Sequence, residues 1–500
     1  ETLQLLEQEQ GKLKLVLLYT MILSQLSMPK TQNVIIDKTH KIEVPVYNSF
    51  TGDKMGSVSQ STEQDVLNAL DSAKIGESIG KKMPASERIA ILRKAVIIME
   101  REFDVLSKLI ATEGIKTISQ ARREVTRALN TMQLSAEEAG RIFGATIPFN
   151  AVTGSEDRVG YEIKVPIGIV VAITPFNDPL NLVCHKLGPA IAAGNPVILK
   201  PSDYTPLVAI KFGEILYESG LPKEMLSIIT GSPEHFGDAL LKDDRIRLIS
   251  FTGGVEAAKI IQKKAGLKKL AMELGSNSPV IVLSDADLEE AVQSCVSGAF
   301  YASGQNCVGV KRIFVEETIY DSFLHNFSQL TSTLKMGSPL SEDVDIGPII
   351  SKELIHQIDD FITESIHHGA KIVSGGKTIG NCYVPTILES DCMNDIANCK
   401  EVFGPVVTIS KVKNLDQAIL CCNKSPFGLH SAIFTNNINN AYKAINELDC
   451  SGVMVNDSTD YRIDAMPFGG VKSSGVGREG VKSAIEAMSE TKVVCLKLKI

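Results

Sequence analysis

The middle of the chain alternates short β-branched runs with helical patterns, and this alternation constrains the fold more than any other feature. The predicted strands are residues 167–173, 197–200, 226–230, 248–252 and 280–283. Successive runs begin 22 to 32 residues apart, which leaves room for one crossover helix between two parallel strands. Repeated strand–helix–strand units predict an α/β fold built on a parallel sheet.

Helical patterns fill the gaps between these runs. They are predicted at residues 187–193, 206–219 and 256–265, and the earlier stretch 63–144 is mostly helical, with its clearest patterns at 86–110 and 117–144. A further helix begins after the N-cap residue Asp287 and ends at Gly304. The next strand is expected at 308–315, so Cys307 should lie on a loop between helix and sheet.

The composition limits the classes of function. The chain has 500 residues, of which 44% are hydrophobic, and this is enough apolar material for two to four globular domains. A net charge of -8 lacks the basic excess that nucleic acid binding needs. The ten cysteines include no C-x-x-C pair, so we expect neither a disulfide scaffold nor a metal site, and a cytoplasmic location fits best.

The two ends of the chain carry different signals. The apolar run near residues 15–23 is too short and too interrupted to cross a bilayer, so no membrane association is predicted. Residues 1–27 are interpreted as an N-terminal extension before a plausible start at Met28, dispensable for turnover. Residues 492–500 alternate apolar and lysine side chains, which predicts a strand with one buried face. That strand could join a sheet of its own subunit or of a neighbour, which favours oligomerisation.

A glycine motif near the C-terminus resembles a dinucleotide-binding loop. Residues 475–480 match G-x-G-x-x-G, but no strand is expected before them and only 20 residues follow. A βαβ unit does not fit into that length. The segment is therefore predicted to be a turn-rich loop followed by a helix.

Three residues are candidates for chemistry on their local context alone. Cys307 follows a helix and has small neighbours, although a lone cysteine is more often a small buried hydrophobic residue. Glu273 ends an apolar run, where burial could raise its pKa toward that of a general base, and the alternative is a salt-bridged structural glutamate. Asn177 follows a predicted strand, at the edge where open α/β sheets bind ligands.

A series of motifs in order makes the chain from about Val34 to the C-terminus resemble the aldehyde dehydrogenase superfamily. The motifs are Thr174-Pro-Phe-Asn177, Lys200-Pro-Ser, Phe251-Thr-Gly-Gly254, Glu273-Leu-Gly, Gly304-Gln-Asn-Cys307, Glu401-Val-Phe403-Gly-Pro and Pro467-Phe-Gly-Gly470. The resemblance implies a Rossmann-like cofactor domain at 28–144 and 164–272, and an α/β catalytic domain at 273–484. It also implies a small oligomerisation hairpin, 145–163 with 485–500, and a homodimer or homotetramer.

The resemblance also assigns catalytic roles. Cys307 matches the nucleophile that attacks the aldehyde, and the thiohemiacetal releases hydride to leave a thioester. Asn177 and the Cys307 backbone N–H would hold the oxyanion, Glu273 would activate the deacylating water, and Lys186 would support the site. Members that pass the acyl group to coenzyme A typically lack this glutamate, so hydrolysis is favoured. A coenzyme A-acylating semialdehyde dehydrogenase and a non-catalytic structural or binding member remain alternatives.

The resemblance implies NAD or NADP as cofactor. Asp203 stands where NAD-preferring members have glutamate, and a shorter carboxylate repels a 2'-phosphate less, so both cofactors stay open. Gly254 replaces a more usual serine, which removes a hydroxyl donor but allows closer approach of the backbone. The residues matched to the cofactor are Thr174, Pro175, Phe176, Lys200, Ser202, Asp203, Gly237, Phe251, Thr252, Gly253, Gly254, Leu274, Glu401 and Phe403.

Two arginines indicate the class of substrate. Arg127 and Arg462 fall at pocket positions where many members that oxidise fatty or aromatic aldehydes carry apolar side chains, which favours a small anionic or hydroxylated aldehyde such as glyceraldehyde 3-phosphate or lactaldehyde. The pattern resembles non-phosphorylating glyceraldehyde-3-phosphate, lactaldehyde, phosphonoacetaldehyde and sulfoacetaldehyde dehydrogenases. It departs from several anion-specific members at Asn306, where they have arginine, and at Asp178, which adds a negative charge. Either arginine could instead be paired with a nearby carboxylate.

Overall fold

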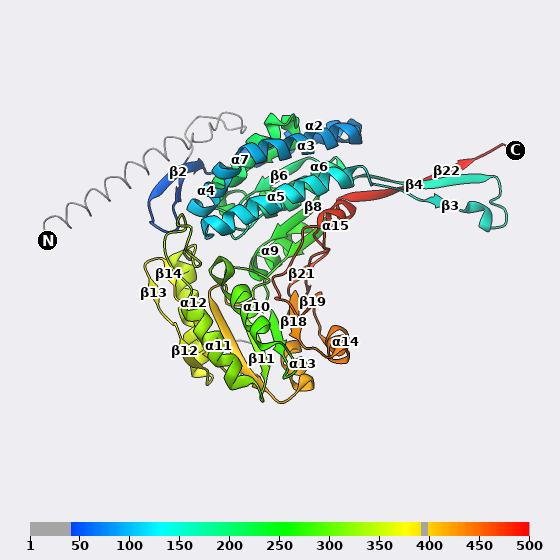
Figure 1. Cartoon of the computed structure of the whole chain (residues 1–500). Helices are drawn as coiled ribbons and strands as arrows, with labels where there is room; N and C mark the ends of the chain where they lie inside the picture. Colours follow the sequence, from blue (N-terminus) through cyan, green and yellow to red (C-terminus); the bar gives the residue numbers. More distant parts are fainter. Residues whose placement is uncertain (1–41, 392–398, 500) are drawn as a thin grey trace.

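The computed structural model describes residues 42–391 and 399–499, so the predicted extension 1–27 and the proposed start at Met28 lie outside the described residues. Figure 1 shows helices over a first sheet, a second sheet with its own helices below, and an arm of strands that projects from the body. The architecture is an α/β fold with parallel sheets, as predicted. No helix in the described ranges is long and apolar enough to cross a membrane.

The N-terminal part of the described chain is a hairpin followed by four helices. Strands β1 (Glu43–Tyr47) and β2 (Lys54–Ser59) pair antiparallel. The predicted helical stretch is confirmed, with a break at Glu102 inside the segment expected to be one pattern. The helices are α2 (Glu63–Lys82), α3 (Ala85–Arg101), α4 (Phe103–Glu113) and α5 (Ile118–Ala139).

The first sheet has six strands in the order β21-β9-β8-β5-β6-β7. Four of the five predicted strands are found here, and they pair in parallel: β5 (Ile169–Ile173), β6 (Val197–Lys200), β7 (Leu226–Ile228) and β8 (Ile246–Thr252). They alternate with α6 (Asn181–Ala193), α7 (Pro206–Glu218), α8 (Gly237–Lys242) and α9 (Val255–Ala265). After β5 the chain adds β6 and then β7 on one side of β5, and it then returns so that β8 pairs with the other side of β5. The point of reversal, between β5 and β8, is where open α/β sheets bind ligands.

Two details of the predicted sheet are wrong. Strand β9 (Lys269–Glu273) was missed because it has no β-branched residue, and it pairs in parallel with β8. The predicted strand at 280–283 is β10 (Pro279–Val282), which belongs to the second sheet. Only residues 274–278 separate β9 from β10, which is too short for the crossover that parallel neighbours in one sheet require. The chain therefore leaves the first sheet at Glu273.

The second sheet has seven strands in the order β12-β15-β16-β11-β10-β18-β19. Its strands are β12 (Lys371–Ser374), β15 (Thr386–Glu389), β16 (Val406–Val412), β11 (Arg312–Glu316), β18 (His430–Phe434) and β19 (Gly452–Val455), with β10 near the centre. The helices around it are α10 (Leu288–Phe300), α11 (Tyr320–Ser332), α12 (Lys352–His367), α13 (Leu415–Asn423) and α14 (Ile438–Glu447). Strand β11 begins four residues later than predicted, because Gly309 and Val310 donate to Asn306 and Gly298 and prolong the turn after Cys307.

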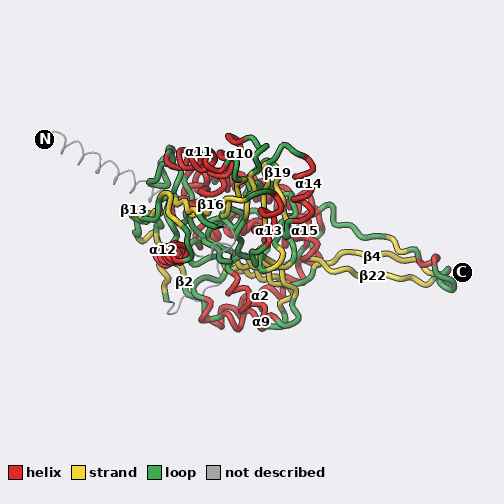
Figure 2. Tube along the Cα trace, turned by 90° about the horizontal axis from the view of Figure 1, so that it is seen from below, coloured by secondary structure: helices red, strands yellow, loops and turns green. Residues whose placement is uncertain are grey.

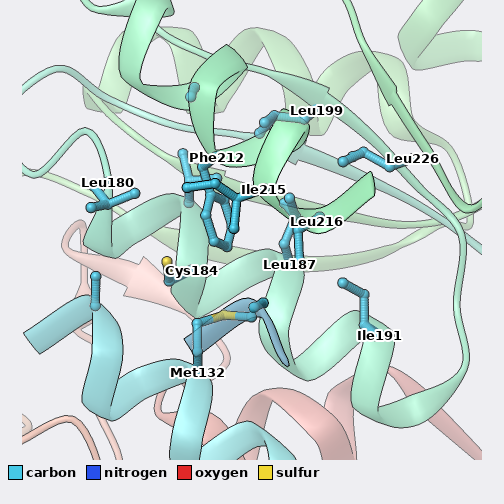
Figure 3. Close-up of a cluster of buried hydrophobic side chains, with 14 of the residues drawn as sticks. Met132, Leu180, Cys184, Leu187, Ile191, Leu199, Phe212, Ile215, Leu216 and Leu226 are labelled. Atoms are coloured by element: carbon cyan, nitrogen blue, oxygen red, sulfur yellow. The ribbon is translucent and has the colours of Figure 1, made fainter. Parts of the chain in front are cut away.

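The largest core fixes the helices that face the first sheet. Figure 3 shows Met132 of α5 against Cys184 and Leu187 of α6, with Phe212, Ile215 and Leu216 of α7 above them. All of these side chains are buried. Close packing at this density holds α5 and α6 in one arrangement, and both helices carry polar residues into the site described below.

The C-terminal strand lies on the projecting arm. Strand β22 (Ser489–Lys497) pairs along its length with β4 (Arg158–Pro166), which also pairs with β3 (Thr146–Ile147). Figure 2 shows β4 and β22 extending side by side away from the body. The predicted buried face is not covered by this chain, since Leu496 is 50% exposed and Leu498 is 45% exposed.

The glycine motif at 475–480 does not open a βαβ unit. It begins with the two-residue strand β21 (Gly475–Val476), antiparallel to β9, and leads into α15 (Val481–Ala487). The helix agrees with the prediction, whereas the short strand was not expected. The motif joins the C-terminal part of the chain to the first sheet; the domain boundaries stay a prediction.

Candidate active site

A cavity of about 380 Å³ lies where the carboxyl ends of β5, β8 and β9 face the loop before β11. This position agrees with the reversal point of the first sheet. The cavity brings together most of the predicted site residues, which come from distant parts of the chain. They are Arg127, Pro175, Phe176, Asn177, Asp178, Thr252, Gly253, Gly254, Glu273, Leu274, Asn306, Cys307, Glu401, Phe403 and Arg462.

The remaining predicted residues do not line this cavity. Thr174 and Lys200 lie at the carboxyl ends of β5 and β6, and Lys200 Nζ is 2.6 Å from Asp203 Oδ1. Ser202 accepts from the Tyr204 backbone N–H within a turn. The others are Gly237, the first residue of α8; Phe251, which is buried in the core beneath Gly253; and Lys186, which is buried on α6.

The loop that carries Cys307 has an unusual backbone. Ala302, Ser303 and Gly304 all have positive φ, which costs free energy for the two residues that have a Cβ. Side-chain contacts hold the loop in place: Ser303 Oγ donates to Gly347 O at 2.9 Å, and the Gln305 amide donates to Pro348 O at 3.1 Å. The backbone carbonyl groups of Gly347 and Pro348 therefore hold the loop in this conformation.

Cys307 is half-buried at the cavity, and its backbone N–H has no protein acceptor among the described residues. Burial raises the pKa of the Cys307 thiol to about 12, against the opposing effect of the Arg462 guanidinium. The Asn177 side chain lines the same cavity and makes no hydrogen bond to the described protein. The site thus holds a thiol and two donors that have no protein partners.

Glu273 ends β9 inside the cavity. Its side chain is buried, and neither carboxylate oxygen has a hydrogen-bond partner in the described protein. Burial and the neighbouring Glu479 carboxylate raise the pKa of Glu273 well above its usual range. An unpartnered carboxylate with a raised pKa has the properties of a general base.

Lys186 and Glu479 form a buried pair at the same site. Lys186 Nζ donates to Glu479 Oε1 at 2.6 Å and to Ser250 Oγ at 2.9 Å. Burial raises the pKa of Glu479, but the nearby cations, Lys186 foremost and also Arg462, outweigh it and lower that pKa to about 2. Sequence reasoning missed Glu479, which lies inside the glycine motif that was set aside as a turn.

The two predicted arginines differ in their partners. Arg127 is paired, with NH2 at 2.9 Å from Asp464 Oδ1 and NH1 at 3.4 Å from Asp178 Oδ2. Arg462 forms no ion pair with any described carboxylate; its guanidinium carbon lies 3.7 Å from the centre of the Phe468 ring. The Arg462 Nε is buried without a hydrogen-bond partner.

His185 does not neutralise Arg462. Burial lowers the pKa of His185, so the ring is neutral. Its Nε2 lies 3.0 Å from Asp464 Oδ1, and that contact requires the hydrogen to be on Nε2. Arg462 NH2, at 3.5 Å from the same nitrogen, then has no acceptor there. The Arg462 guanidinium therefore has no carboxylate within ion-pair distance among the described residues; burial lowers its pKa, and the more distant Glu479 and Asp464 oppose that effect.

A second buried pair was also missed. Lys116 Nζ lies 2.7 Å from Glu124 Oε2 and also contacts Asp178. The other Glu124 oxygen accepts from the backbone N–H groups of Leu180 and Asn181, at the start of α6. The sequence signal was available, because Glu124 is a charged residue on the same face of α5 as the apolar residues Ala121, Val125 and Ala128. The pair fixes the loop that carries Asn177.

The residues at the cofactor end suit a dinucleotide. Helix α9 begins without a side-chain cap, so its first backbone N–H groups are free to bind a pyrophosphate. A Cβ at Gly254 would meet no atom within 4 Å, which leaves open space in front of that helix. Phe176 packs edge-on against Phe403 and Tyr204, and Thr174 Oγ1 is buried without a partner. The described ranges contain no cluster of metal-ligating side chains.

Comparison with known proteins assigns the fold and the site to a family. The model of the aldehyde dehydrogenase family matches residues 35–494. The chain belongs to this family. It is an NAD(P)-dependent oxidoreductase that acts on aldehydes. Similar chains have been solved with NADP and with NAD+, and the cofactor of this enzyme is NAD or NADP.

Three similar proteins show how far the likeness extends. Aspartate-semialdehyde dehydrogenase 1 of Pseudomonas canavaninivorans is 44% identical over 91% of this chain and 97% of its own. The 3-sulfolactaldehyde dehydrogenase of Priestia megaterium is 42% identical over 91% and 95%. The glyceraldehyde-3-phosphate dehydrogenase GapN of Methanocaldococcus jannaschii, solved with NADP, is 38% identical over 92% and 100%, with a TM-score of 0.88. The likeness therefore spans nearly whole chains.

Proposed function

We propose that this aldehyde dehydrogenase oxidises a small anionic aldehyde to its carboxylic acid through a thiohemiacetal and a thioester on Cys307. The observation that carries the proposal is the Arg462 guanidinium, which has no carboxylate within ion-pair distance among the described residues and shares one cavity with the Cys307 thiol. A buried guanidinium without a carboxylate partner favours an anionic ligand. The rest of the cavity supplies groups for the chemistry.

Cys307 is the nucleophile in this proposal. Its sulfur attacks the aldehyde carbon, and the negative charge develops on the carbonyl oxygen. The Asn177 amide and the Cys307 backbone N–H are the free donors available to that oxygen. Arg462 lowers the free energy of the thiolate, because it opposes the rise in the Cys307 pKa that burial causes.

Glu273 takes the role of general base. After loss of hydride from the thiohemiacetal, water must attack the thioester carbonyl, and Glu273 would accept a proton from that water. Both of its oxygens are free for this contact. Lys186 supports the site by holding Glu479 in its ionised form beside Glu273.

The cofactor end of the site uses the residues that the family motifs indicate. NAD or NADP, when bound, supplies the two-electron oxidant. Thr252, Gly253 and Gly254 would hold its phosphates at the start of α9, and Lys200, Ser202 and Asp203 would face the adenine ribose. Glu401 and Phe403 would lie against the nicotinamide ribose and ring, with Phe176 beside them. The remaining candidates near this cofactor are Thr174, Pro175, Gly237, Phe251 and Leu274.

The two arginines have different roles at the substrate end of the cavity. Arg462 binds the anionic group, whereas Arg127 is held by Asp178 and Asp464 and shapes the wall of the pocket. Asn306 and Asp178 complete this wall. The names of the three relatives indicate aldehydes with a carboxylate, a sulfonate or a phosphate, and this supports an anionic substrate here.

Two rival functions remain distinguishable. A coenzyme A-acylating enzyme would release an acyl thioester, and the free carboxylate of Glu273 argues for hydrolysis instead. A non-catalytic structural member would be expected to lose catalytic groups, but Cys307, Glu273 and Asn177 all line the cavity. Analysis of the product distinguishes these cases.

The arm favours a homodimer or homotetramer. Apolar side chains of β4 and β22, including Val159 at 53% exposed and Val493 at 59% exposed, are not covered by this chain. A second copy would bury them. We place the enzyme in the cytoplasm, because the mechanism needs Cys307 as a free thiol.

The test is a substrate panel with both cofactors. We expect kcat/KM for glyceraldehyde 3-phosphate, sulfoacetaldehyde or succinic semialdehyde to exceed that for propanal by about 100-fold, because a charge-assisted contact to Arg462 is gained. The product should be the free acid whether or not coenzyme A is present. A preference for propanal would contradict the anionic substrate, and an acyl-coenzyme A product would contradict hydrolysis.

A further inference from the structure

Lys311 is a buried cation that the catalytic scheme above does not use. It lies directly before β11, and its side chain is 3% exposed. Its backbone is held on both sides, since its N–H donates to Ser278 O at 3.1 Å and its carbonyl accepts from the Thr408 N–H at 2.9 Å. The backbone from which the ammonium group extends is therefore fixed between Ser278, which directly precedes β10, and Thr408 of β16.

The Lys311 ammonium bridges two loops of the active site. It donates to Gly304 O at 2.5 Å and to Gly404 O at 3.0 Å. Gly304 is in the loop that leads to Cys307, and Gly404 directly follows Phe403. The loops touch at this point, because a Cβ at Gly304 would lie 2.1 Å from Gly404 O. Two carbonyl oxygens converge there, and the cation stabilises both.

The charge of Lys311 has no ion-pair partner among the described residues, but it interacts with the two ionisable groups at the front of these loops. Burial lowers the pKa of Lys311 to about 8, and the neighbouring Glu401 and Cys307 oppose that effect. Lys311 is therefore mostly protonated at neutral pH. A thiolate at Cys307 would add a second counter-charge to that of Glu401.

We propose that Lys311 is a positioning residue that fixes the Cys307 loop against the Glu401–Phe403 loop and stabilises the Cys307 thiolate with its positive charge. The inference rests on the proposed role of Cys307 as nucleophile and adds a residue that acts through it. Arg462 is the cation on the substrate side of the thiol, and Lys311 is the cation behind the loop. The loop has three successive left-handed residues, so a fixed anchor is needed to keep it in this shape.

The experiment measures the reactivity of the thiol without turnover. In the enzyme without cofactor, iodoacetamide alkylation of the Cys307 peptide is followed by mass spectrometry from pH 6 to 10. Lys311→Met should slow alkylation at pH 7 about tenfold, because the thiolate loses a nearby cation and its population falls. The KM for NADP should rise about fivefold as the two loops separate.

Lys311→Gln separates the two effects. Its amide can still donate to one carbonyl but carries no charge, so KM should return toward the native value while alkylation stays slow. Lys411→Met is the control, because Lys411 is an exposed lysine on β16, 51% exposed at its side chain. Thermal melting checks the fold of each variant, and Lys311→Gln is decisive if Lys311→Met does not fold.

An alkylation profile in both folded Lys311 variants that matches the native profile would overturn the inference. Failure of the proposed function gives a different result, since Cys307→Ala would then retain aldehyde oxidation whatever the alkylation profiles show.

Discussion

Two groups of polar residues at the cavity differ in their partners. In the paired group, Lys116, Glu124, Arg127, Asp178 and Asp464 form ion pairs with one another. In the unpaired group, the side chains of Asn177, Glu273 and Cys307 make no hydrogen bond to the described residues, and Arg462 has no carboxylate within ion-pair distance. Burying an unpaired polar group costs free energy, so its persistence indicates a ligand. In our proposal the paired group keeps the shape of the site, and the unpaired group binds the substrate and reacts with it.

The largest effect is expected at the nucleophile. Cys307→Ala should reduce aldehyde oxidation by about 10⁴-fold or more, because no thiohemiacetal can form. The measurement is NAD(P)H formation under saturating substrate. Cys450→Ala is the matched control, since that thiol contacts Ser431 in the second sheet and lies outside the cavity. Retained turnover in Cys307→Ala would contradict the mechanism.

Glu273→Gln should have the next largest effect. We expect kcat to fall by about 10³-fold, with a burst of NAD(P)H and an acyl adduct on Cys307, because the thioester forms but is not hydrolysed. The native kcat should increase with pH, since the base form of Glu273 appears only above its raised pKa. The variant should lose this increase. A native-like pH profile in Glu273→Gln would exclude Glu273 as the base.

A substitution in the paired group should mainly lower the stability of the fold. Glu124→Gln leaves Lys116 with a weaker partner in a buried position, and we expect a loss of about 3 kcal/mol in the free energy of unfolding. The kcat/KM should fall about tenfold for anionic and neutral aldehydes alike. Arg122→Ala removes an ion pair of the same 2.7 Å length, to Glu342, on the surface, and it should change neither quantity measurably. A fall of kcat/KM in Glu124→Gln for anionic aldehydes alone would contradict the different roles of the paired and unpaired groups.

Much of the fold could be predicted because its signals are local. The spacing of β-branched runs predicted β5, β6, β7 and β8, since each strand and its crossover helix fit between successive runs. Strand β9 was not predicted, because its sequence, Lys-Leu-Ala-Met-Glu, contains no β-branched or aromatic residue. Its place in the sheet is set by pairing with β8 and β21. Strand β10 lies in the second sheet because the connection between β9 and β10, residues 274–278, is too short for a crossover within one sheet.

The sequence predicted which candidate residues meet at the cavity better than it predicted their partners. Motifs at strand ends and loops led to Cys307, Glu273 and Asn177, and the structure places all three at one cavity. The partners of the charged residues could not be predicted, because they come from distant parts of the chain. Arg127 meets Asp464 across 337 residues, and no local pattern links them. The sequence therefore could not show that Arg127 forms ion pairs and that Arg462 forms none within the described residues.

The most direct test of the account compares these two arginines. The ratio of kcat/KM for sulfoacetaldehyde to that for propanal is measured in the native enzyme, Arg462→Leu and Arg127→Leu. We expect the ratio to fall about 100-fold in Arg462→Leu, because a charge-assisted contact is lost, and less than about threefold in Arg127→Leu. An unchanged ratio in Arg462→Leu, or an equal fall in both variants, would contradict the claim that Arg462 binds the substrate anion.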